Sequence, residues 1–288
     1  MTDLMIIGKS GQLGTELVNI CNKRGKRFVA FGSEELDITN YAKVNKVIGV
    51  IKPKIIINTA AFHVVPECEK NPNRAFAVNS LAVGNLAEVA KKHKLKLVTY
   101  STDYVFDGKK GKPYLETDLP NPLQAYGLSK LAGETNAQTI YPEGVYIIRT
   151  CGLYGGKASS KSKKGNFVLN ILTEAKRGSA VKVSSELIVN PTFAGDLAKT
   201  TLKLLGLNAP SGVYHLANEG FMSWYDFARK ILKFANLKNQ VIPLKGQATA
   251  RELKRPRFSA LANTQASKLG IVMPTIEDGL KKYLKEIL

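Results

Sequence analysis

The stretch LMIIGKSGQLG, residues 4–14, joins a short apolar run to the start of a helical pattern. Four consecutive apolar residues, Leu4–Ile7, predict a buried strand. Apolar residues then recur at spacings of three and four, which predicts a helix over Gln12–Lys23 with one buried face. Three glycines, Gly8, Gly11 and Gly14, mark the junction in the pattern G-x-x-G-x-x-G. A strand, a glycine-rich turn and a helix in this order indicate the first unit of an open α/β sheet.

The three glycines have distinct physical tasks in such a turn. Gly8 permits the tight bend, Gly11 lets the backbone approach a phosphate, and Gly14 lets the helix pack closely on the sheet. The first turn of the helix, through Gln12 and Leu13, offers N–H groups and the positive end of its dipole to a pyrophosphate. The stretch therefore predicts a dinucleotide site, although a turn in which glycine only relieves backbone strain would show the same pattern.

The alternation of strand and helix continues over the first 150 residues. Further strands are predicted at Phe28–Phe31, Lys54–Asn58, Leu95–Thr99 and Val145–Arg149, and further helices at Tyr41–Ile51 and Asn73–Lys91. Such a series is typical of a Rossmann-type, doubly wound parallel α/β sheet buried on both faces. We expect a dinucleotide-binding domain over residues 1–150. A smaller C-terminal lobe, residues 151–288, should mainly bind substrate, with strands that can thread between the two lobes.

The end of the second predicted strand indicates which dinucleotide is bound. A carboxylate at that tip would hold the ribose 2′-hydroxyl of NAD, but the strand ends in Gly32-Ser33, with two glutamates just beyond. Lys9, in the glycine turn, is placed to face a 2′-phosphate. These features favour NADP over NAD, with Ser33 beside the ribose. Asp37 is placed to reach the adenine edge or, alternatively, to cap the helix that begins near Asn40.

A tyrosine and a lysine, Tyr126 and Lys130, lie one turn apart on a predicted helix. An ammonium group beside a phenol lowers the phenol pKa from its usual value of about 10. The pair can then act as a general acid toward a carbonyl oxygen while hydride reaches the carbonyl carbon. The spacing alone is common on helix surfaces. The fourth strand, however, leads into Ser101-Thr102-Asp103 at the edge where ligands bind, and a Ser or Thr hydroxyl there would complete a hydroxyl–Tyr–Lys set.

These motifs resemble the extended short-chain dehydrogenase/reductase superfamily. Longer strings are similar to the dTDP-4-dehydrorhamnose reductase family, and they follow the same order over nearly the whole chain. They are YSTDYVFDG (Tyr100–Gly108), PLQAYGLSKLAGE (Pro122–Glu134), RTCGLYG (Arg149–Gly155), YHLANEGFMSWYDF (Tyr214–Phe227) and RPRFSAL (Arg255–Leu261).

The resemblance implies a role for each matching residue. Thr102, Tyr126 and Lys130 would form the catalytic triad, with Tyr126 as proton donor and Lys130 also on the nicotinamide ribose. The sugar would contact Thr102, Asp103 and Tyr104. Cofactor contacts are implied for Gly11, Gln12 and Leu13 at the pyrophosphate, Asp37 and Ile38 at the adenine, and Ala61, Phe62, His63 and Tyr100 along the rest of the cleft. The implied reaction reduces the C4 ketone of a dTDP-linked 6-deoxy sugar, converting dTDP-4-dehydro-L-rhamnose to dTDP-L-rhamnose.

Two departures from the family pattern fall in the substrate lobe. The family has Trp after Arg-Thr-Ser, whereas this chain has Gly152 after Cys151, and its Asp-Gln-x-Gly-x-Pro-Thr appears as Glu186–Thr192 (ELIVNPT). The reductase chemistry is therefore better supported than the rhamnose product. A related nucleotide-sugar epimerase or reductase stays open, as does a non-catalytic NADP-binding partner resembling the regulatory subunit of methionine adenosyltransferase. The single tryptophan, Trp224, is expected to anchor its helix in the core behind a capping Ser223.

The chain carries 42 Lys+Arg against 23 Asp+Glu, a net charge of +19. Residues 151–288 hold 22 basic and 9 acidic residues, a net of +13 out of that total. A charge of this size suits nucleic acid, but the sequence contains no nucleic-acid-binding module. We expect a small anionic nucleotide-sugar substrate instead, with Arg257 as its diphosphate contact.

Composition excludes several other classes of protein. With 44% hydrophobic residues in 288, global disorder is excluded, and the apolar runs are too short to cross a bilayer. The N-terminus lacks the pattern of a secretory signal. Three widely spaced cysteines exclude a disulfide framework, and scattered histidines suggest no metal site. We therefore expect a cytoplasmic protein with no membrane or metal partner, and the resemblance alone suggests a homodimer.

Overall fold

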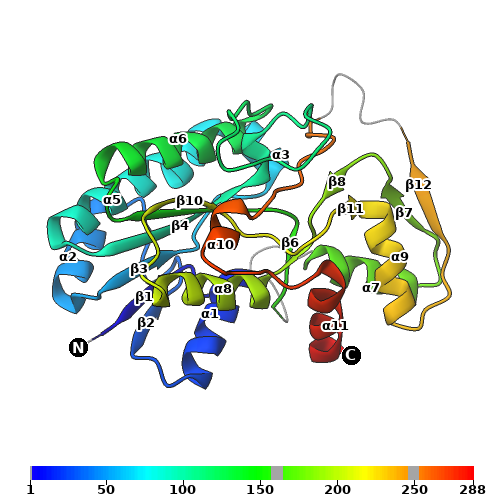
Figure 1. The fold of residues 1–288 in the computed structure, drawn as a ribbon, viewed down its shortest axis with the longest axis horizontal. Helices are drawn as coiled ribbons and strands as arrows, with labels where there is room; N and C mark the ends of the chain where they lie inside the picture. The colour runs from blue at the N-terminus through cyan, green and yellow to red at the C-terminus, as the bar shows by residue number, and fades with distance from the viewer. Residues whose placement is uncertain (1, 157–164, 246–252) are drawn as a thin grey trace.

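The computed structural model describes residues 2–156, 165–245 and 253–288. Six parallel strands form the central sheet in the order β10-β5-β4-β3-β1-β2 (Figure 1). Their bounds are β1 (Leu4–Ile7), β2 (Phe28–Phe31), β3 (Ile55–Asn58), β4 (Lys96–Thr102), β5 (Val145–Thr150) and β10 (Gly212–His215). The doubly wound parallel α/β sheet is thereby confirmed. The chain reverses direction across the sheet between β1 and β3, and open α/β sheets bind ligands at such a switch point.

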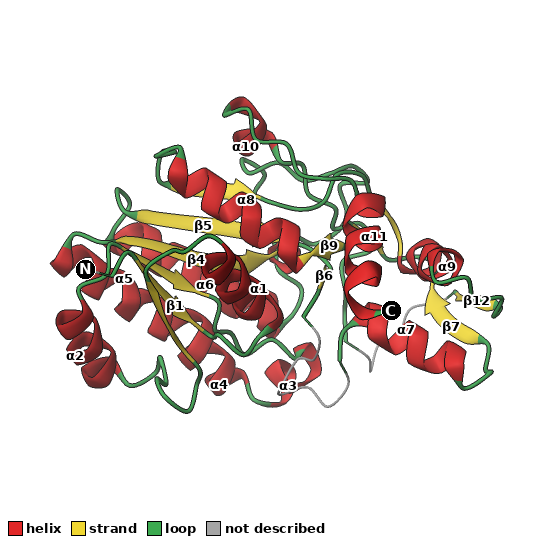
Figure 2. Ribbon diagram, turned by 90° about the horizontal axis from the view of Figure 1, so that it is seen from below, coloured by secondary structure: helices red, strands yellow, loops and turns green. Residues whose placement is uncertain are grey.

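Helices cover both faces of the sheet because successive strand side chains point to opposite sides. Leu4 and Ile6 of β1 pack against α1 (Gln12–Lys23) and α8 (Ala194–Gly206). Met5 and Ile7 pack on the other side. The helices there are α2 (Tyr41–Ile51), α5 (Ala82–His93) and α6 (Ala125–Ile140). Figure 2, turned by 90°, shows the sheet between its helices, with the smaller lobe beside it.

The predicted helix over residues 73–91 is found as several consecutive helical pieces. After α3 (Val65–Lys70), the chain runs through α4 (Pro72–Phe76), a π-helical turn η1 (Ala77–Leu81) and α5. A π-turn inserts an extra residue into a helix and is frequent at functional sites. Here it places Asn79, which is fully buried, between the end of β3 and α6.

The smaller lobe has its own core, in which aromatic rings pack among aliphatic side chains. The Tyr154 ring lies 5.4 Å from Phe227 and 5.5 Å from Tyr283 between centroids. The lobe contains α7 (Phe167–Lys176), α9 (Trp224–Phe234), α11 (Ile276–Ile287) and the strand pairs β6 (Leu153–Tyr154) with β9 (Thr192–Phe193), β7 (Val181–Ser184) with β12 (Val241–Leu244), and β8 (Ile188–Val189) with β11 (Met222–Ser223). The chain also leaves this lobe to add α8 and β10 to the larger one.

Two short elements pack on the larger lobe. A 3-10 turn, η2 (Asp103–Val105), follows β4, and α10 (Thr264–Lys268) packs on β10. Val105, Phe106, Cys151 and Leu261 form a small apolar cluster beneath the junction. No helix in the described part of the chain is long and apolar enough to cross a membrane.

Candidate active site

The glycine turn has the geometry that its sequence predicts. Gly8 has a φ of +89°, and a Cβ on it would lie 2.6 Å from the Thr59 hydroxyl oxygen. A Cβ on Gly14 would lie 2.1 Å from the Gly8 carbonyl oxygen, so helix α1 can approach the turn only with glycine there. Gly11 caps α1 without a side-chain hydrogen bond, which leaves the first N–H groups of the helix for an anion. The Gln12 side-chain oxygen nearby is buried without a hydrogen-bond partner.

Two adjoining cavities lie along the carboxyl edge of the sheet. The larger, of about 310 Å³, contains the Thr–Tyr–Lys set, and the smaller, of about 280 Å³, lies beyond the glycine turn. Both are lined by Gly11, Thr59, Ala60, Ala61 and His63. The larger also receives Gln12, Leu13, Gly14, Tyr100, Thr102, Asp103, Tyr104, Tyr126 and Lys130, and the smaller Gly8, Ser33, Asp37, Ile38 and Phe62. A long, two-part ligand such as a dinucleotide fits this arrangement, because the glycine cradle lies where the two cavities meet and the unpartnered Gln12 oxygen, in the larger one, can accept a hydrogen bond from a ligand.

Two of the predicted site residues lie outside both cavities. Lys9 reaches away from them to Glu35, and Arg257 has an exposed side chain while its carbonyl accepts a hydrogen bond from the Ile188 N–H. Tyr100 lines the larger cavity, but its hydroxyl donates to Thr201 in the core at 3.0 Å. The Tyr100 hydroxyl is thus already hydrogen-bonded, to a residue of helix α8. The roles of Tyr100 and Arg257 stay predictions.

Helix α6 brings Tyr126 to the end of β4. Its first turn is capped by the Gln124 side chain, which accepts a hydrogen bond from the Gly127 N–H at 3.0 Å. A Cβ on Gly127 would lie 2.1 Å from the Tyr104 carbonyl oxygen, so this glycine allows the close contact between α6 and η2. The Tyr126 ring then meets the Tyr104 ring edge-on, 6.0 Å away between centroids, and Tyr126 lines the same cavity as Thr102. Lys130, one turn later, is buried in the same cavity.

Burial dominates the electrostatics of the pair. It raises the pKa of Tyr126 well above its usual value, although the Thr102 hydroxyl lowers it in part. Burial also lowers the pKa of Lys130 to about 8, against an opposing effect of Glu134. The expectation of a lowered Tyr126 pKa is therefore wrong for this structure. Burial destabilises the phenolate by more than nearby groups stabilise it, so the pKa rises. A phenol that keeps its proton at neutral pH is still suited to donate one.

Asp103 lies beside Thr102 and joins it to a distant segment. The Thr102 hydroxyl donates to one carboxylate oxygen of Asp103 at 3.1 Å, and the Ser259 hydroxyl donates to the other at 2.5 Å. The pKa of Asp103 is raised to about 6 by complete burial, which outweighs the hydrogen bonds from Ser259, Cys151 and Thr102. This carboxylate fixes the direction of the Thr102 hydroxyl. The analysis of the sequence missed Ser259, although it lies within the RPRFSAL string.

Asn79 is a second buried residue that the sequence analysis missed. Its amide exchanges two hydrogen bonds with the backbone of Phe62, at 2.9 and 2.8 Å, and donates a third to the Ser129 hydroxyl at 3.0 Å. It therefore ties the cleft loop after β3 to helix α6. An amide in the middle of a helical pattern was the only local signal of this role.

The carboxyl end of β2 has a neighbour that the sequence did not predict. The expectation that no carboxylate lies there is wrong, since Glu35 folds back and accepts a hydrogen bond from the Gly32 N–H at 2.7 Å. The same carboxylate accepts a hydrogen bond from the Lys9 ammonium at 2.7 Å. These two contacts hold the pKa of Glu35 below its usual value. Lys9 is consequently engaged by a carboxylate beside the ribose side of the smaller cavity.

Two other features surround the smaller cavity. The alternative role of Asp37 as a helix cap is wrong, because the Asn40 side chain caps α2 by accepting from the Lys43 N–H at 3.0 Å. Asp37 instead accepts hydrogen bonds from the N–H and hydroxyl of Thr39 while lining the cavity. The Thr39 hydrogen bonds hold the pKa of Asp37 below its usual value, and Arg74, which the sequence analysis did not select and which also lines the cavity, adds to this effect. Arg74 thus gives the smaller cavity a cation in its own lining, whereas Lys9 lies outside it.

Trp224 has a different environment from the one expected. It does follow a capping serine, Ser223, whose hydroxyl accepts from the Asp226 N–H at 3.0 Å. It is only half-buried, however, and it lines the larger cavity together with Gly152. The description of Trp224 as a core anchor is therefore incomplete. The space beside Gly152 is taken by the indole of Trp224, the first residue of helix α9.

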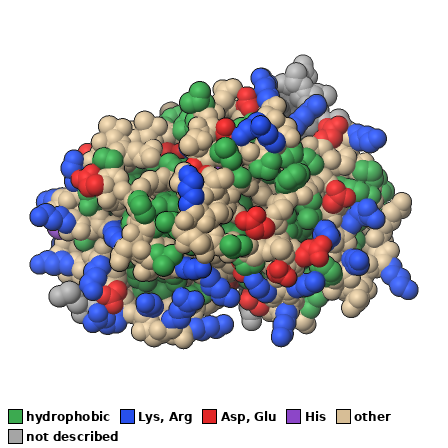
Figure 3. Space-filling view, in the orientation of Figure 1, with side chains coloured by type: hydrophobic (Ala, Val, Ile, Leu, Met, Phe, Trp, Pro, Cys, Tyr) green, Lys and Arg blue, Asp and Glu red, His purple; other side chains and the backbone are tan. Residues whose placement is uncertain are grey.

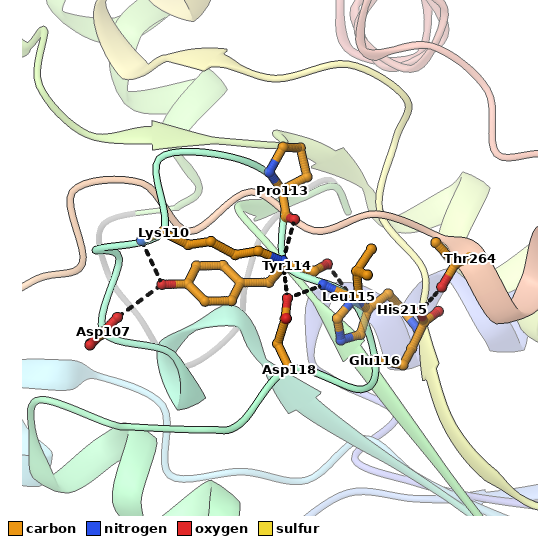
Figure 4. Close-up of polar contacts among 9 residues, drawn as sticks. All are labelled: Asp107, Lys110, Pro113, Tyr114, Leu115, Glu116, Asp118, His215 and Thr264. Atoms are coloured by element: carbon orange, nitrogen blue, oxygen red, sulfur yellow. Dashed lines mark hydrogen bonds and ion pairs between the residues drawn. The ribbon is translucent and has the colours of Figure 1, made fainter.

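His215 belongs to a structural network away from the cavities (Figure 4). Its ring Nδ1 lies 3.1 Å from the Tyr114 carbonyl oxygen, and its backbone N–H donates to the Glu116 carboxylate at 3.2 Å. The same carboxylate accepts from Thr264 at the start of α10. Burial lowers the pKa of His215 to about 4, so the ring is neutral. Among the described residues, no group of three or more His, Cys, Asp or Glu side chains is arranged to hold a metal ion.

A family model described as the RmlD substrate binding domain matches residues 1–288, the whole chain. The chain belongs to the RmlD family. The dTDP-4-dehydrorhamnose reductase of Aggregatibacter actinomycetemcomitans is 35% identical to it over 287 residues, covering 96% of this chain and 95% of the relative. The dTDP-4-keto-6-deoxy-D-glucose reductase of Streptomyces niveus is 32% identical over 94% of this chain and 92% of the relative.

A solved structure extends the likeness to the fold of this RmlD family member. The crystal structure of dTDP-4-dehydrorhamnose reductase from Bacillus anthracis in complex with NADP matches it with a TM-score of 0.93 and 33% sequence identity, covering 99% of this chain and all of that one. The protein is accordingly an NAD(P)-dependent enzyme of the dTDP-sugar reductase family. The two relatives named above carry different substrate names, so the family by itself leaves the sugar open.

Proposed function

We propose that this enzyme uses NADPH to reduce the C4 ketone of dTDP-4-dehydro-L-rhamnose, giving dTDP-L-rhamnose. The observation that carries the proposal is the convergence of Thr102, Tyr126 and Lys130 in a cavity that adjoins the glycine turn. A hydroxyl, a protonated phenol and an ammonium group around one cavity suit reduction of a ketone, because the oxygen becomes negatively charged as the carbon receives hydride.

The chain supplies the proton and the orientation. When bound, NADPH supplies the hydride to C4. The Tyr126 hydroxyl transfers its proton to O4, so the ketone becomes an alcohol and Tyr126 is left as phenolate. The Thr102 hydroxyl, whose proton points to Asp103 in this structure, would rotate to donate that proton in a hydrogen bond to the carbonyl oxygen when the substrate is bound. The Lys130 ammonium stabilises the phenolate until solvent returns the proton. Each step uses a side chain that lines the larger cavity.

The residues around the glycine turn would hold the dinucleotide. The N-terminus of α1, with Gly11, Gln12 and Leu13, would receive the pyrophosphate. Ser33, Asp37 and Ile38 would surround the adenosine in the smaller cavity, with Arg74 close to its phosphate side. Residues 151–288 would mainly hold the nucleotide sugar, and Arg257 stays our candidate for a diphosphate contact.

Turnover of a defined substrate tests the proposal directly. We expect the purified protein to oxidise NADPH, followed at 340 nm, when dTDP-4-dehydro-L-rhamnose is formed in situ, and to release dTDP-L-rhamnose. Absence of turnover, together with co-purification of a larger enzyme, would instead favour the partner-subunit alternative. Retained NAD with no net consumption would favour an epimerase. Turnover of dTDP-4-keto-6-deoxy-D-glucose in preference to the rhamnose precursor would correct the sugar but keep the reductase.

The ion pair between Lys9 and Glu35 predicts how coenzyme preference can be changed. In the Glu35→Gln variant, Lys9 loses its carboxylate partner and becomes available to a 2′-phosphate. We expect the ratio of kcat/KM for NADPH to that for NADH to rise roughly two- to fivefold, the scale of one exposed ion pair. Lys9→Met should lower the ratio by a similar factor, because Glu35 is then an unpaired carboxylate facing the phosphate.

A neighbouring glutamate provides the matched control for this prediction. Glu34 is exposed and adjacent in sequence, so Glu34→Gln removes the same charge without freeing Lys9. Its coenzyme ratio should stay near that of the wild type. Equal ratios in the Glu34 and Glu35 variants would show that only net charge matters and that Lys9 does not contact the 2′-phosphate.

The proposal assigns the positive charge to small anions and not to nucleic acid. Figure 3 shows Lys and Arg side chains spread over the visible face, with acidic side chains between them. All three cysteines are buried and unpaired, which suits the cytoplasm. A homodimer stays a prediction that light scattering on the purified protein will test.

A further inference from the structure

A glycine and a tryptophan meet at one wall of the larger cavity. Gly152 follows β5 with a φ of +55°, and a Cβ on it would lie 3.2 Å from Cη2 of Trp224. The Asn190 carbonyl oxygen and Pro191 Cα are equally close to that position. Two of the three nearest neighbours of a Cβ at residue 152 would thus be backbone atoms, and the third is the edge of the indole. A Cβ at residue 152 would press against the indole, which would have to shift by a few tenths of an ångström.

Trp224 is held in place by its backbone and by neighbouring rings. The Trp224 backbone N–H donates to the Leu187 carbonyl oxygen at 3.2 Å, directly after the pairing of β11 with β8. Its ring packs 4.4 Å from the Phe167 ring and 6.1 Å from the Phe227 ring between centroids. The ring is nevertheless half-buried, so part of it remains open to the cavity. A rigidly held, partly exposed indole is a prepared contact surface.

The cavity therefore has two chemically different parts. Thr102, Tyr126 and Lys130 supply its polar groups, whereas Leu153, Val189 and Trp224 supply apolar surface. A hexose has hydroxyl groups at its edge and C–H groups on its faces, and a 6-deoxy sugar adds a methyl group. Reaction requires the carbonyl to lie against the polar part. The remaining ring surface must then contact the apolar part, where the indole is the largest group.

We propose that Trp224 is a specificity-determining residue whose indole contacts the C–H face and methyl group of the bound sugar over Gly152. The inference rests on the proposed function, since it assumes that a nucleotide-linked sugar enters this cavity. It goes beyond that function by assigning recognition of the deoxy sugar to a single side chain, outside the catalytic set and the glycine turn.

The sequence offers a direct probe, because Trp224 is the only tryptophan in the chain. With excitation at 295 nm, the emission of the wild-type protein in the presence of NADP⁺ reports on this indole alone. We expect saturating dTDP-L-rhamnose to change its intensity or emission maximum, and dTDP without the sugar to give a smaller change. Calorimetry on the same samples establishes that the ligand is bound. Bound dTDP-L-rhamnose that leaves the emission as it is with dTDP would overturn the inference.

Variants provide a second readout that a purely structural role would not give. Trp224→Phe keeps an aromatic ring against Phe167, and Trp224→Leu removes the aromatic surface. We expect KM for the 4-keto sugar nucleotide to rise a fewfold in the first and roughly tenfold in the second, with KM for NADPH unchanged in both. Phe221→Leu is the matched control, as Phe221 lies three residues away, is exposed and packs on Phe258 outside the cavity.

The outcomes separate this inference from the proposed function. If the wild type reduces the substrate while both Trp224 variants keep its KM, the proposed function stands and the role of Trp224 is rejected. If Trp224→Leu only lowers thermal stability, the indole is structural and the inference is rejected. If calorimetry shows no binding of dTDP-L-rhamnose, UDP-glucose or dTDP to the wild type, the proposed function fails and the inference with it.

Discussion

A Tyr126→Phe variant should reduce the 4-keto sugar about 10²- to 10⁴-fold more slowly than the wild type, the range over which a positioned general acid contributes to a rate. The reason is local, since phenylalanine retains the ring and its contact with Tyr104 but has no proton to donate. Because the raised pKa keeps Tyr126 protonated at neutral pH, the wild type carries this proton throughout the assay range. We expect the loss in kcat, measured as NADPH oxidation at saturating substrate.

Two measurements distinguish the loss of a proton donor from a loss of structure. Binding of NADP⁺ to Tyr126→Phe, followed by calorimetry, should stay close to wild type, and the thermal unfolding midpoint should change little. Tyr41→Phe removes a hydroxyl from an exposed tyrosine at the start of α2 and should keep full activity. Full turnover in Tyr126→Phe would reject Tyr126 as the acid and with it the mechanism proposed above.

The largest effect on stability should come from Glu134→Gln. Glu134 on α6 and Arg149 on β5 form an ion pair whose side chains are only 4% and 5% exposed. The guanidinium donates from its Nε at 3.0 Å and from a terminal nitrogen at 2.6 Å. Removing the carboxylate charge leaves a buried cation without a counter-charge. We expect the free energy of unfolding in urea to fall by about 3–5 kcal/mol.

A surface pair on α7 gives the control. Glu174 and Arg177 also form a Glu–Arg pair, but their side chains are 48% and 67% exposed, so Glu174→Gln should cost at most about 0.5 kcal/mol. The double variant Glu134→Leu with Arg149→Met should recover much of the lost stability, because it leaves no buried charge. Equal losses in the buried and surface variants would mean that the buried pair does not hold α6 to the sheet.

Short-range sequence patterns determined the frame of the protein. Runs such as Leu4–Ile7 are apolar at every position because both faces of a central strand are covered, and Gly14 is required by its close contact with the Gly8 carbonyl oxygen within one turn. The four-residue spacing of Tyr126 and Lys130 fixed their common helix face in the same way. These features depend on neighbours only a few residues away, so they could be predicted without the tertiary structure.

Burial and long-range contacts were decided only by the tertiary structure. The pKa of Tyr126 rises instead of falling because packing removes water from the phenol, which no local pattern reports. Glu35 returns to the tip of β2 through a turn whose conformation the residue order did not reveal. The contact of Ser259 with Asp103 joins residues 156 positions apart.

The contact between Gly152 and Trp224 likewise combines features predicted from the sequence with one that only the tertiary structure decided. The sequence alone showed that Gly152 leaves a site without the expected side chain, and it placed Trp224 at the start of a helix behind Ser223. Their meeting at one cavity wall depends on how β5, β8 and α9 pack together. The residue types and local elements were thus set by the sequence. Which side chains share a cavity was set by packing between distant segments, because side-chain periodicity carries information about one element at a time.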